Sequence, residues 1–65
     1  MSEFKDMVRE ILITEHMRTE QEANDLIVNY PKPILLGIMG KMNVRQAAMG
    51  LEMLESEALK GGSDE

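Results

Sequence analysis

Apolar and polar residues alternate along the first part of the chain with the period of an amphipathic helix. The apolar positions fall at i, i+3, i+4, i+7 and i+8: Phe4, Met7, Val8, Ile11 and Leu12. Charged residues fill the opposite face, and Ser2 precedes the pattern as a helix N-cap. The pattern predicts a first helix that ends between Glu15 and Met17.

A second helix is predicted to begin immediately after Thr19. Thr19-Glu20-Gln21-Glu22 has the spacing of a capping box, in which the first and fourth side chains each bond the other residue's backbone N–H. The apolar stripe that follows is Ala23, Leu26, Ile27 and Tyr30. Pro31 and Pro33 should end this helix and form a corner over residues 29–32, and Pro33 suits the first turn of a third helix.

Two interpretations of the segment from Pro33 to Leu59 remain open. In one, the chain breaks at Gly40, and Asn43 caps a final helix. In the other, which we favour, a single helix with a gentle kink runs through both glycines, because small and apolar residues continue at spacings of three and four. That stripe consists of Gly37, Gly40, Val44, Ala47, Leu51, Leu54 and Ala58. Gly61-Gly62 should end the helix and leave residues 61–65 as a flexible polar tail.

The predicted fold is all-α, with two short helices and a long C-terminal helix in one domain over residues 1–60. A chain of 65 residues without cysteine has few means of stabilising itself as a monomer, which favours oligomerisation. We therefore predict an intertwined homodimer in which the small residues permit close helix approach. The expected dimer interface is Gly37, Gly40, Val44, Ala47, Leu51 and Leu54. The four methionines beside it, residues 39, 42, 49 and 53, would serve as adaptable filler, unless they complete a core within one chain.

Charge divides the chain into an acidic and a basic part. Residues 1–30 contain seven acids and three bases, whereas residues 26–51 contain no acid but include Lys32, Lys41 and Arg45. The net charge of −5 disfavours general binding to nucleic acid. Charges interrupt every apolar run before it reaches the length of a membrane span, and the first residues are acidic rather than basic as in a secretion signal. We expect a cytoplasmic protein that does not contact the membrane.

Residues with catalytic or ligand-binding chemistry are few and scattered. His16 and Glu20 have the i, i+4 spacing of two metal ligands, but they straddle a predicted helix break, so we interpret His16 as a solvent-facing loop residue. The three serines lie near helix ends or in the tail, and none is placed to be activated by a base as a nucleophile. Gly37-x-x-Gly40 lacks the lysine and hydroxyl of a phosphate-binding loop. We expect a protein that is not an enzyme and that binds neither cofactor nor metal.

Two classes of function remain. The first is a protein-binding module, for which the candidate contact residues are an acidic helix face and a small basic patch: Glu3, Asp6, Glu10, Lys41 and Arg45. The second is a small DNA-binding regulator, in which the helix after Thr19 and the helix after the proline corner imitate a helix-turn-helix. Its recognition helix would begin Pro33-Ile34-Leu35-Leu36 and would offer the base edges no Arg, Asn or Gln before Lys41. We therefore favour the binding module.

Most of the chain, from about Phe4 to Glu55, resembles a group of very short proteins encoded by temperate and transposable bacteriophages. The similar stretches are Phe4-Lys5-x-x-Val8-Arg9, Arg18-Thr19-Glu20-x-Glu22-Ala23, Tyr30-Pro31, Gly37-Ile38-Met39, Arg45-x-Ala47 and Glu52-Met53. This group includes an anti-activator of quorum sensing, a small helical dimer that binds a LuxR-type transcription regulator of the host. That anti-activator blocks DNA binding by the regulator and also inhibits the type IV pilus assembly ATPase. The resemblance implies an early phage protein that inhibits host proteins in the bacterial cytoplasm.

Overall fold

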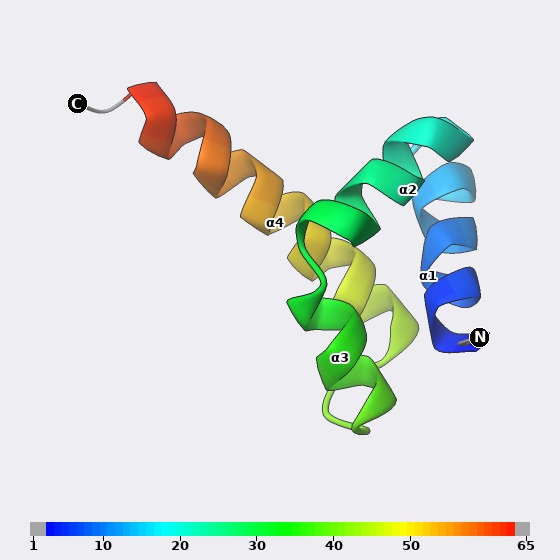
Figure 1. Ribbon diagram of the computed structural model, residues 1–65. Helices are drawn as coiled ribbons and strands as arrows, with labels where there is room; N and C mark the ends of the chain where they lie inside the picture. The colour runs from blue at the N-terminus through cyan, green and yellow to red at the C-terminus, as the bar shows by residue number, and fades with distance from the viewer. Residues whose placement is uncertain (1–2, 64–65) are drawn as a thin grey trace.

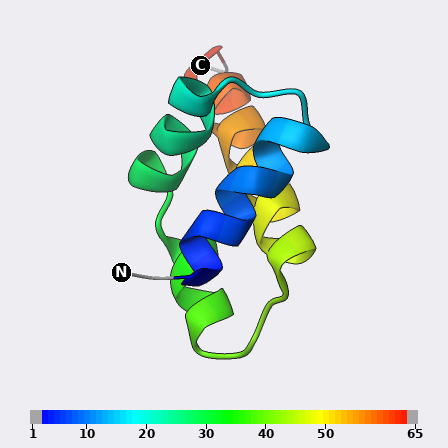
Figure 2. The same cartoon turned by 90° about the vertical axis from the view of Figure 1, so that its right-hand side faces the viewer.

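The structure, a computed structural model, describes residues 3–63 of the chain and the side chains of residues 3–60. All regular secondary structure in this range is helical: α1 (Glu3–Thr14), α2 (Glu20–Asn29), α3 (Lys32–Ile38) and α4 (Val44–Ser63). The first three helices pack around the N-terminal half of α4 (Figures 1 and 2), and the C-terminal half of α4 projects from this body (Figure 1). No described helix combines the length and the apolar character that crossing a membrane requires.

The hydrophobic core receives residues from all four helices. The buried apolar residues are Val8, Leu12, Ala23, Leu26, Ile27, Ile34, Ala47, Ala48 and Leu51. Their burial is the main source of stability, because removing apolar surface from water contributes roughly 25 cal/mol per Å². The buried stripe of α4 ends at Leu51, and after it every described side chain except those of Glu52 and Glu55 is exposed. The core therefore uses only the first part of the longest helix.

Local sequence signals determine the course of the chain from α1 to α3. α1 ends at Thr14, one residue before the predicted range. The predicted capping box at the start of α2 is confirmed: the Glu22 N–H donates to Thr19 Oγ1 at 3.1 Å, and the Thr19 N–H donates to Glu22 Oε1 at 3.0 Å. Pro33 lies buried in the first turn of α3, as predicted. The predicted N-cap, Ser2, lies outside the described residues.

The prediction of one helix from Pro33 to Leu59 is wrong. α3 ends at Ile38 and α4 begins at Val44, so residues 39–43 form a turn. Gly40 has a φ of +82°, a left-handed conformation that an α-helix cannot accommodate and that glycine adopts without steric cost. A second capping box then starts α4, because the Gln46 N–H donates to Asn43 Oδ1 at 2.8 Å and the Asn43 N–H donates to Gln46 Oε1 at 2.9 Å. The alternative interpretation, a break at Gly40 with Asn43 as cap, is the correct one.

The end of α4 also differs from the prediction. The helix continues through Gly61 and Gly62 to Ser63, instead of stopping at the two glycines. Lys60 lies in its last turn, where a positive charge interacts favourably with the helix dipole. Of the predicted polar tail, residues 64–65 lie outside the described residues.

Candidate functional site

The first candidate surface is an acidic layer on α1 and α2. We use this name for the exposed carboxylates of these two helices: Glu3, Asp6, Glu10, Glu20, Glu22 and Asp25. Arg9 links the two helices within the layer, because its guanidinium donates to Asp6 Oδ1 at 3.0 Å and to Asn24 Oδ1 at 3.3 Å. The acidic layer thus spans two helices that are in contact, and it has more negative than positive groups.

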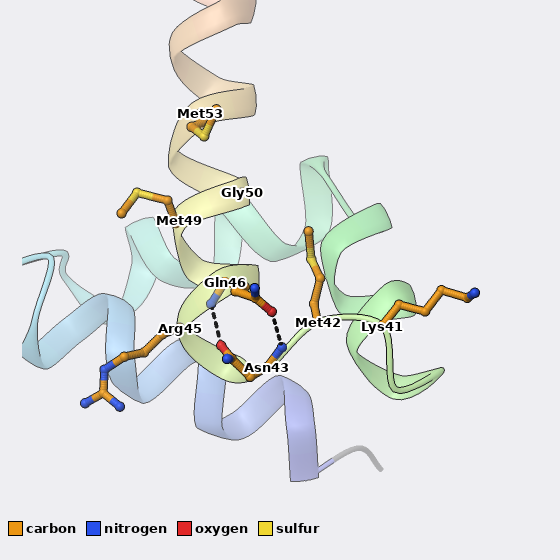
Figure 3. A pocket seen from close by; sticks show the side chains of 8 residues that line it. All are labelled: Lys41, Met42, Asn43, Arg45, Gln46, Met49, Gly50 and Met53. Carbon is orange, nitrogen blue, oxygen red and sulfur yellow. Dashed lines mark hydrogen bonds between the residues drawn. The ribbon is translucent and has the colours of Figure 1, made fainter.

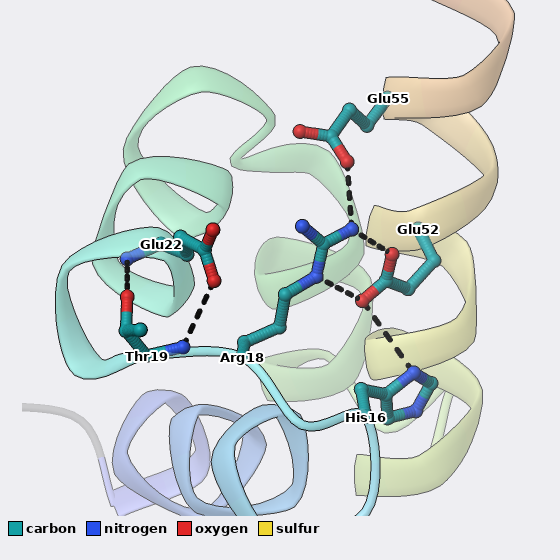
Figure 4. A network of polar contacts seen from close by, with 6 residues as sticks. All are labelled: His16, Arg18, Thr19, Glu22, Glu52 and Glu55. Carbon is teal, nitrogen blue, oxygen red and sulfur yellow. Dashed lines mark hydrogen bonds and ion pairs between the residues drawn. The ribbon is translucent and has the colours of Figure 1, made fainter.

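A network of polar contacts anchors the connection between α1 and α2 to α4 (Figure 4). Arg18 Nε donates to Glu52 Oε2 at 2.9 Å, a guanidinium nitrogen of Arg18 donates to Glu52 Oε1, and the same nitrogen donates to Glu55 Oε1 at 2.8 Å. His16 Nδ1 lies 3.5 Å from Glu52 Oε2. These side chains are largely shielded from water, with 24% exposure for Arg18 and 21% for Glu52. The network holds the α2 end of the acidic layer against α4.

The charges in these contacts change the pKa values of two carboxyl groups. The hydrogen bond from Arg18 holds the pKa of Glu52 below its ordinary value, against the opposing effect of burial. A hydrogen bond from Arg45 similarly lowers the pKa of Glu15, which Arg45 approaches to 2.5 Å (Nη2 to Oε2) and 3.3 Å (Nε to Oε1). Both carboxylates therefore stay ionised to a lower pH than an unperturbed glutamate does. They act as structural ion pairs between α4 and the segment that follows α1.

The second candidate surface is a groove beside α4, which we call the methionine groove. One part, of about 520 Å³, lies along the start of α4 and is lined by Met42, Met49, Gly50 and Met53 among others (Figure 3). A second part, of about 290 Å³, lies between α3 and α4 and shares Met42, Gly50 and Met53 with the first. Three flexible thioether side chains and one glycine therefore shape a continuous depression.

Two of the groove methionines, Met49 and Met53, lie on the face of α4 opposite the core. Ala47, Ala48 and Leu51 face inward with no exposure, while Met49 and Met53, four residues apart on the helix, are 55% and 61% exposed. The alternative prediction, in which the methionines complete the core of one chain, is therefore wrong for these two residues. Met42 alone among the groove methionines is half-buried and packs against the core.

The residues predicted for the dimer interface do not form one ridge. Ala47 and Leu51 are fully buried by their own chain, and Val44 is half-buried against the same core. Gly37 faces the ring of Phe4, because a Cβ added there would lie 2.0 Å from two ring carbons. Gly40 is exposed in the turn after α3.

Leu54 is the predicted interface residue that retains exposed apolar surface, at 38%, on the projecting half of α4. The close-approach stripe predicted from the sequence is in large part the internal contact of α4 with α1 and α3.

The residues predicted for partner binding fall on two separate surfaces. Glu3, Asp6 and Glu10 lie on α1 within the acidic layer. Lys41 lies in the turn before α4 and Arg45 in the first turn of α4, and both line the methionine groove. Arg45 is paired with Glu15, so its charge is partly compensated.

Sequence reasoning missed the contacts that join distant parts of the chain. His16 is not a freely solvated loop residue: its side chain is only 23% exposed and faces Glu52. Nothing in the spacing of Arg18 and Glu52 indicates that they meet across 34 residues. The cap of α4 did have a signal, since Asn43-x-x-Gln46 has the same spacing as the capping box at Thr19. No group of three or more His, Asp or Glu side chains in the described part of the chain is arranged to hold a metal ion.

Comparison with known proteins finds no matching family model, no matching curated protein and no matching solved structure.

Proposed function

We propose that the protein is a non-enzymatic inhibitor, encoded by a phage, that binds a host transcription regulator of quorum sensing and blocks its DNA binding. The observation that carries this proposal is the acidic layer: six carboxylates lie exposed on one pair of packed helices. The resemblance to short phage proteins supplies the class of target, and the acidic layer supplies a physical mode of action.

The mode of action is competition with DNA by charge. The surface with which a regulator contacts DNA is basic, because it must neutralise phosphates. Residues 3–29 contain seven acids and three bases, a net charge of −4, and are therefore attracted to such a surface. Complementary charge accelerates association and selects the partner. A regulator covered by the acidic layer would have its DNA-contacting residues occupied without any chemical change.

The experiment is a competition between the protein and operator DNA. A LuxR-type regulator is bound to fluorescently labelled operator, the protein is added, and release of DNA is followed by fluorescence anisotropy. The matched variants are Glu10→Lys in the acidic layer and Glu57→Lys on the projecting half of α4, both exposed and both changing the charge by the same amount. We expect Glu10→Lys to raise the half-inhibiting concentration on the order of tenfold, or about 1.4 kcal/mol, and Glu57→Lys to leave it near the wild-type value.

Two results would contradict the proposal. If the protein releases no DNA at concentrations well above that of the regulator, it is not an inhibitor of this kind. If the protein alone changes the anisotropy of the labelled operator in a salt-dependent way, the alternative of a DNA-binding regulator gains support instead. Circular dichroism of both variants establishes that a loss of inhibition is not a loss of helix.

The same binding mode extends to a second host target, the type IV pilus assembly ATPase, as the resemblance implies. Direct binding is measured by titrating the labelled protein with the purified ATPase, using the same two charge variants. An affinity equally insensitive to Glu10→Lys and Glu57→Lys would place that contact outside the acidic layer.

We further propose that the protein forms a homodimer through the projecting half of α4. Leu54, Ala58 and Leu59 continue the apolar side of α4 beyond the body, and Leu59 is 73% exposed. A second copy that packs its own projecting half there would cover these residues. Sedimentation velocity should show Leu59→Lys as a monomer, while the control Met17→Lys, at a position 84% exposed in the connection after α1, stays dimeric. A wild-type protein that sediments as a monomer at micromolar concentration would overturn this proposal.

A further inference from the structure

The methionine groove is an exposed apolar surface without a cover in the described part of the chain. Four of its residues on α4, Gln46, Met49, Gly50 and Met53, recur at spacings of three and four, so they form a line along the helix. From Gln46 to Met53 the line is about 10 Å long, at 1.5 Å per residue, which corresponds to about two helical turns of a partner. Exposed apolar side chains that line one depression offer a partner apolar surface to bury.

The composition of the groove fits an α-helical occupant. Gly50 carries no side chain, and a Cβ added there would touch Pro33 Cγ at 3.5 Å, Pro33 Cβ at 3.7 Å and Met42 Cε at 3.8 Å, so Pro33 and Met42 form the floor of the groove beside this glycine. Methionine side chains are flexible and polarisable, and they adapt to aliphatic side chains of different shapes. An amphipathic helix that lays its apolar stripe into such a groove is a common mode of recognition.

The charges around the groove determine which helix fits. Lys32 lines the part between α3 and α4, and Lys41 lines the part at the start of α4. Figure 3 shows Lys41 and Arg45 pointing outward on opposite sides of the groove. Neither Lys32 nor Lys41 forms an ion pair within the described residues, and no acid is among the residues that line either part of the groove. Unpaired cations on the rim attract carboxylates that flank an apolar stripe.

We propose that the methionine groove binds an amphipathic helix of a partner protein, with aliphatic residues in its stripe and acidic residues on both flanks. This site is separate from the acidic layer on α1 and α2: the layer suits a basic partner, whereas the groove, which residues of α3, α4 and the turn between them line, suits an acidic one. The protein thereby has two docking surfaces of opposite charge preference, and the groove proposal does not depend on the proposed inhibition of a transcription regulator.

The test selects helices without assuming the identity of the partner. A display library of helical 18-residue peptides carries a fixed leucine stripe at i, i+3, i+4 and i+7, with Glu or Lys at random on the flanks, and is selected on the immobilised full-length protein. We expect peptides with Glu on both flanks to be enriched at least tenfold over those with Lys. The double variant Lys32→Glu/Lys41→Glu should reverse this preference. Enrichment of Lys-flanked peptides on the wild type, or no enrichment at all, would overturn the proposal.

The location of binding is read from the methionines themselves. The ε-methyl groups are labelled with ¹³C, and the selected peptide is titrated while their NMR signals are recorded. Signals of Met42, Met49 and Met53 should shift, while those of Met7 and Met17 stay unchanged. Met53→Ser should weaken binding at least fivefold, and Met17→Ser, at a more exposed position outside the groove, should leave it within twofold of wild type.

Two outcomes of the titration would refute the groove as this docking site. In the first, peptide binding shifts only methyl signals outside the groove. In the second, the groove methyl signals shift as the concentration of the protein alone is raised, and adding the peptide does not reverse these shifts. A second copy of the chain would then be the occupant of the groove. Inhibition of DNA binding in the competition assay is unaffected by either outcome, so the two proposals fail separately.

Discussion

Two of the glycines that lie within helices should respond differently to alanine: replacing one of them should stabilise the protein, whereas replacing the other should destabilise it. Gly37 lies in α3 and Gly50 in α4, and both are glycines within helices. Alanine is favoured over glycine in a helix interior by roughly 1 kcal/mol, so local propensity alone predicts that both substitutions stabilise the protein. The surroundings of the added Cβ make the difference.

At Gly50 the added Cβ has room. Its nearest neighbours would be Pro33 Cγ at 3.5 Å, Pro33 Cβ at 3.7 Å and Met42 Cε at 3.8 Å, which are ordinary van der Waals contacts. The gain in helix propensity is therefore retained, and we expect Gly50→Ala to stabilise the protein by about 0.5–1 kcal/mol. For a domain of this size, 1 kcal/mol corresponds to a rise in Tm of about 4–8 °C.

At Gly37 the added Cβ would collide with an aromatic ring. It would lie 2.0 Å from Cε1 and Cζ of Phe4 and 2.7 Å from Cε2, so the ring must leave its place against the core. Overpacking of this kind costs about 1–3 kcal/mol, and the propensity gain near the end of a seven-residue helix does not offset it. We expect Gly37→Ala to lower the free energy of unfolding by about 1 kcal/mol or more.

Urea denaturation followed by circular dichroism at one fixed protein concentration measures both effects. A double-mutant cycle adds Phe4→Ala, which removes the ring; in that background Gly37→Ala should no longer destabilise. Two results would refute the packing of the Phe4 ring of α1 against α3. In one, Gly37→Ala and Gly50→Ala change the free energy of unfolding in the same direction. In the other, Gly37→Ala still destabilises the protein when the Phe4 ring is absent.

Three further predictions concern the polar network, the turn before α4 and the start of α2. The pKa of Glu52 is lowered in the folded state, chiefly by its hydrogen bond from Arg18. The pair therefore stabilises the protein above the ordinary carboxyl pKa, and this contribution is lost as the pH falls through the pKa that Glu52 has in the folded protein. Wild type should therefore lose stability more steeply than Glu52→Gln from about pH 5 downward in thermal melts; parallel curves would contradict the pairing. Gly40→Ala forces a side chain into a φ of +82° and should cost about 1–2 kcal/mol in urea denaturation, whereas a neutral effect would exclude this turn. Thr19→Ala removes the acceptor for the Glu22 N–H and should cost about 1 kcal/mol, with Thr19→Ser close to wild type as its control.

The local structure of the chain was largely predictable from the sequence. The stripe of α1, the capping box at Thr19 and the two prolines each act within one or two helical turns, so their residues carry the full signal. The all-helical fold is confirmed for the described residues. The homodimer stays a prediction.

The errors arose where two signals competed. Small residues at spacings of three and four indicated a continuous helix through Gly40, while Asn43 and Gln46 indicated a new start. The structure has the new start. The left-handed Gly40 interrupts the helix, and the capping box then gives hydrogen-bond partners to the N–H groups of Asn43 and Gln46. The part of the stripe that does face its own chain lies on both sides of the break: Gly37 on α3 faces Phe4, and Val44, Ala47 and Leu51 on α4 pack in or against the core.

The candidate surfaces were predictable only in part. The acids of α1 and the cations Lys41 and Arg45 were identified by type, since exposed charges follow from helical periodicity. Their separation onto two surfaces depends on the turn over residues 39–43, which redirects the chain and opens the groove between α3 and α4. The contacts of Arg18 with Glu52 and Glu55 depend on the same tertiary arrangement, and no local pattern in the sequence predicts them.

The proposed inhibition requires that the acidic layer is the surface that engages the DNA-binding domain of the regulator. The most direct measurement is a backbone amide NMR titration of the ¹⁵N-labelled protein with the isolated DNA-binding domain of a LuxR-type regulator, at low and at high salt. We predict shifts for the amides of Glu3, Asp6 and Glu10 and for those of α2, and these shifts should diminish as salt is raised. Shifts confined to α3 and α4, or no shifts with an excess of the domain, would contradict this mode of binding.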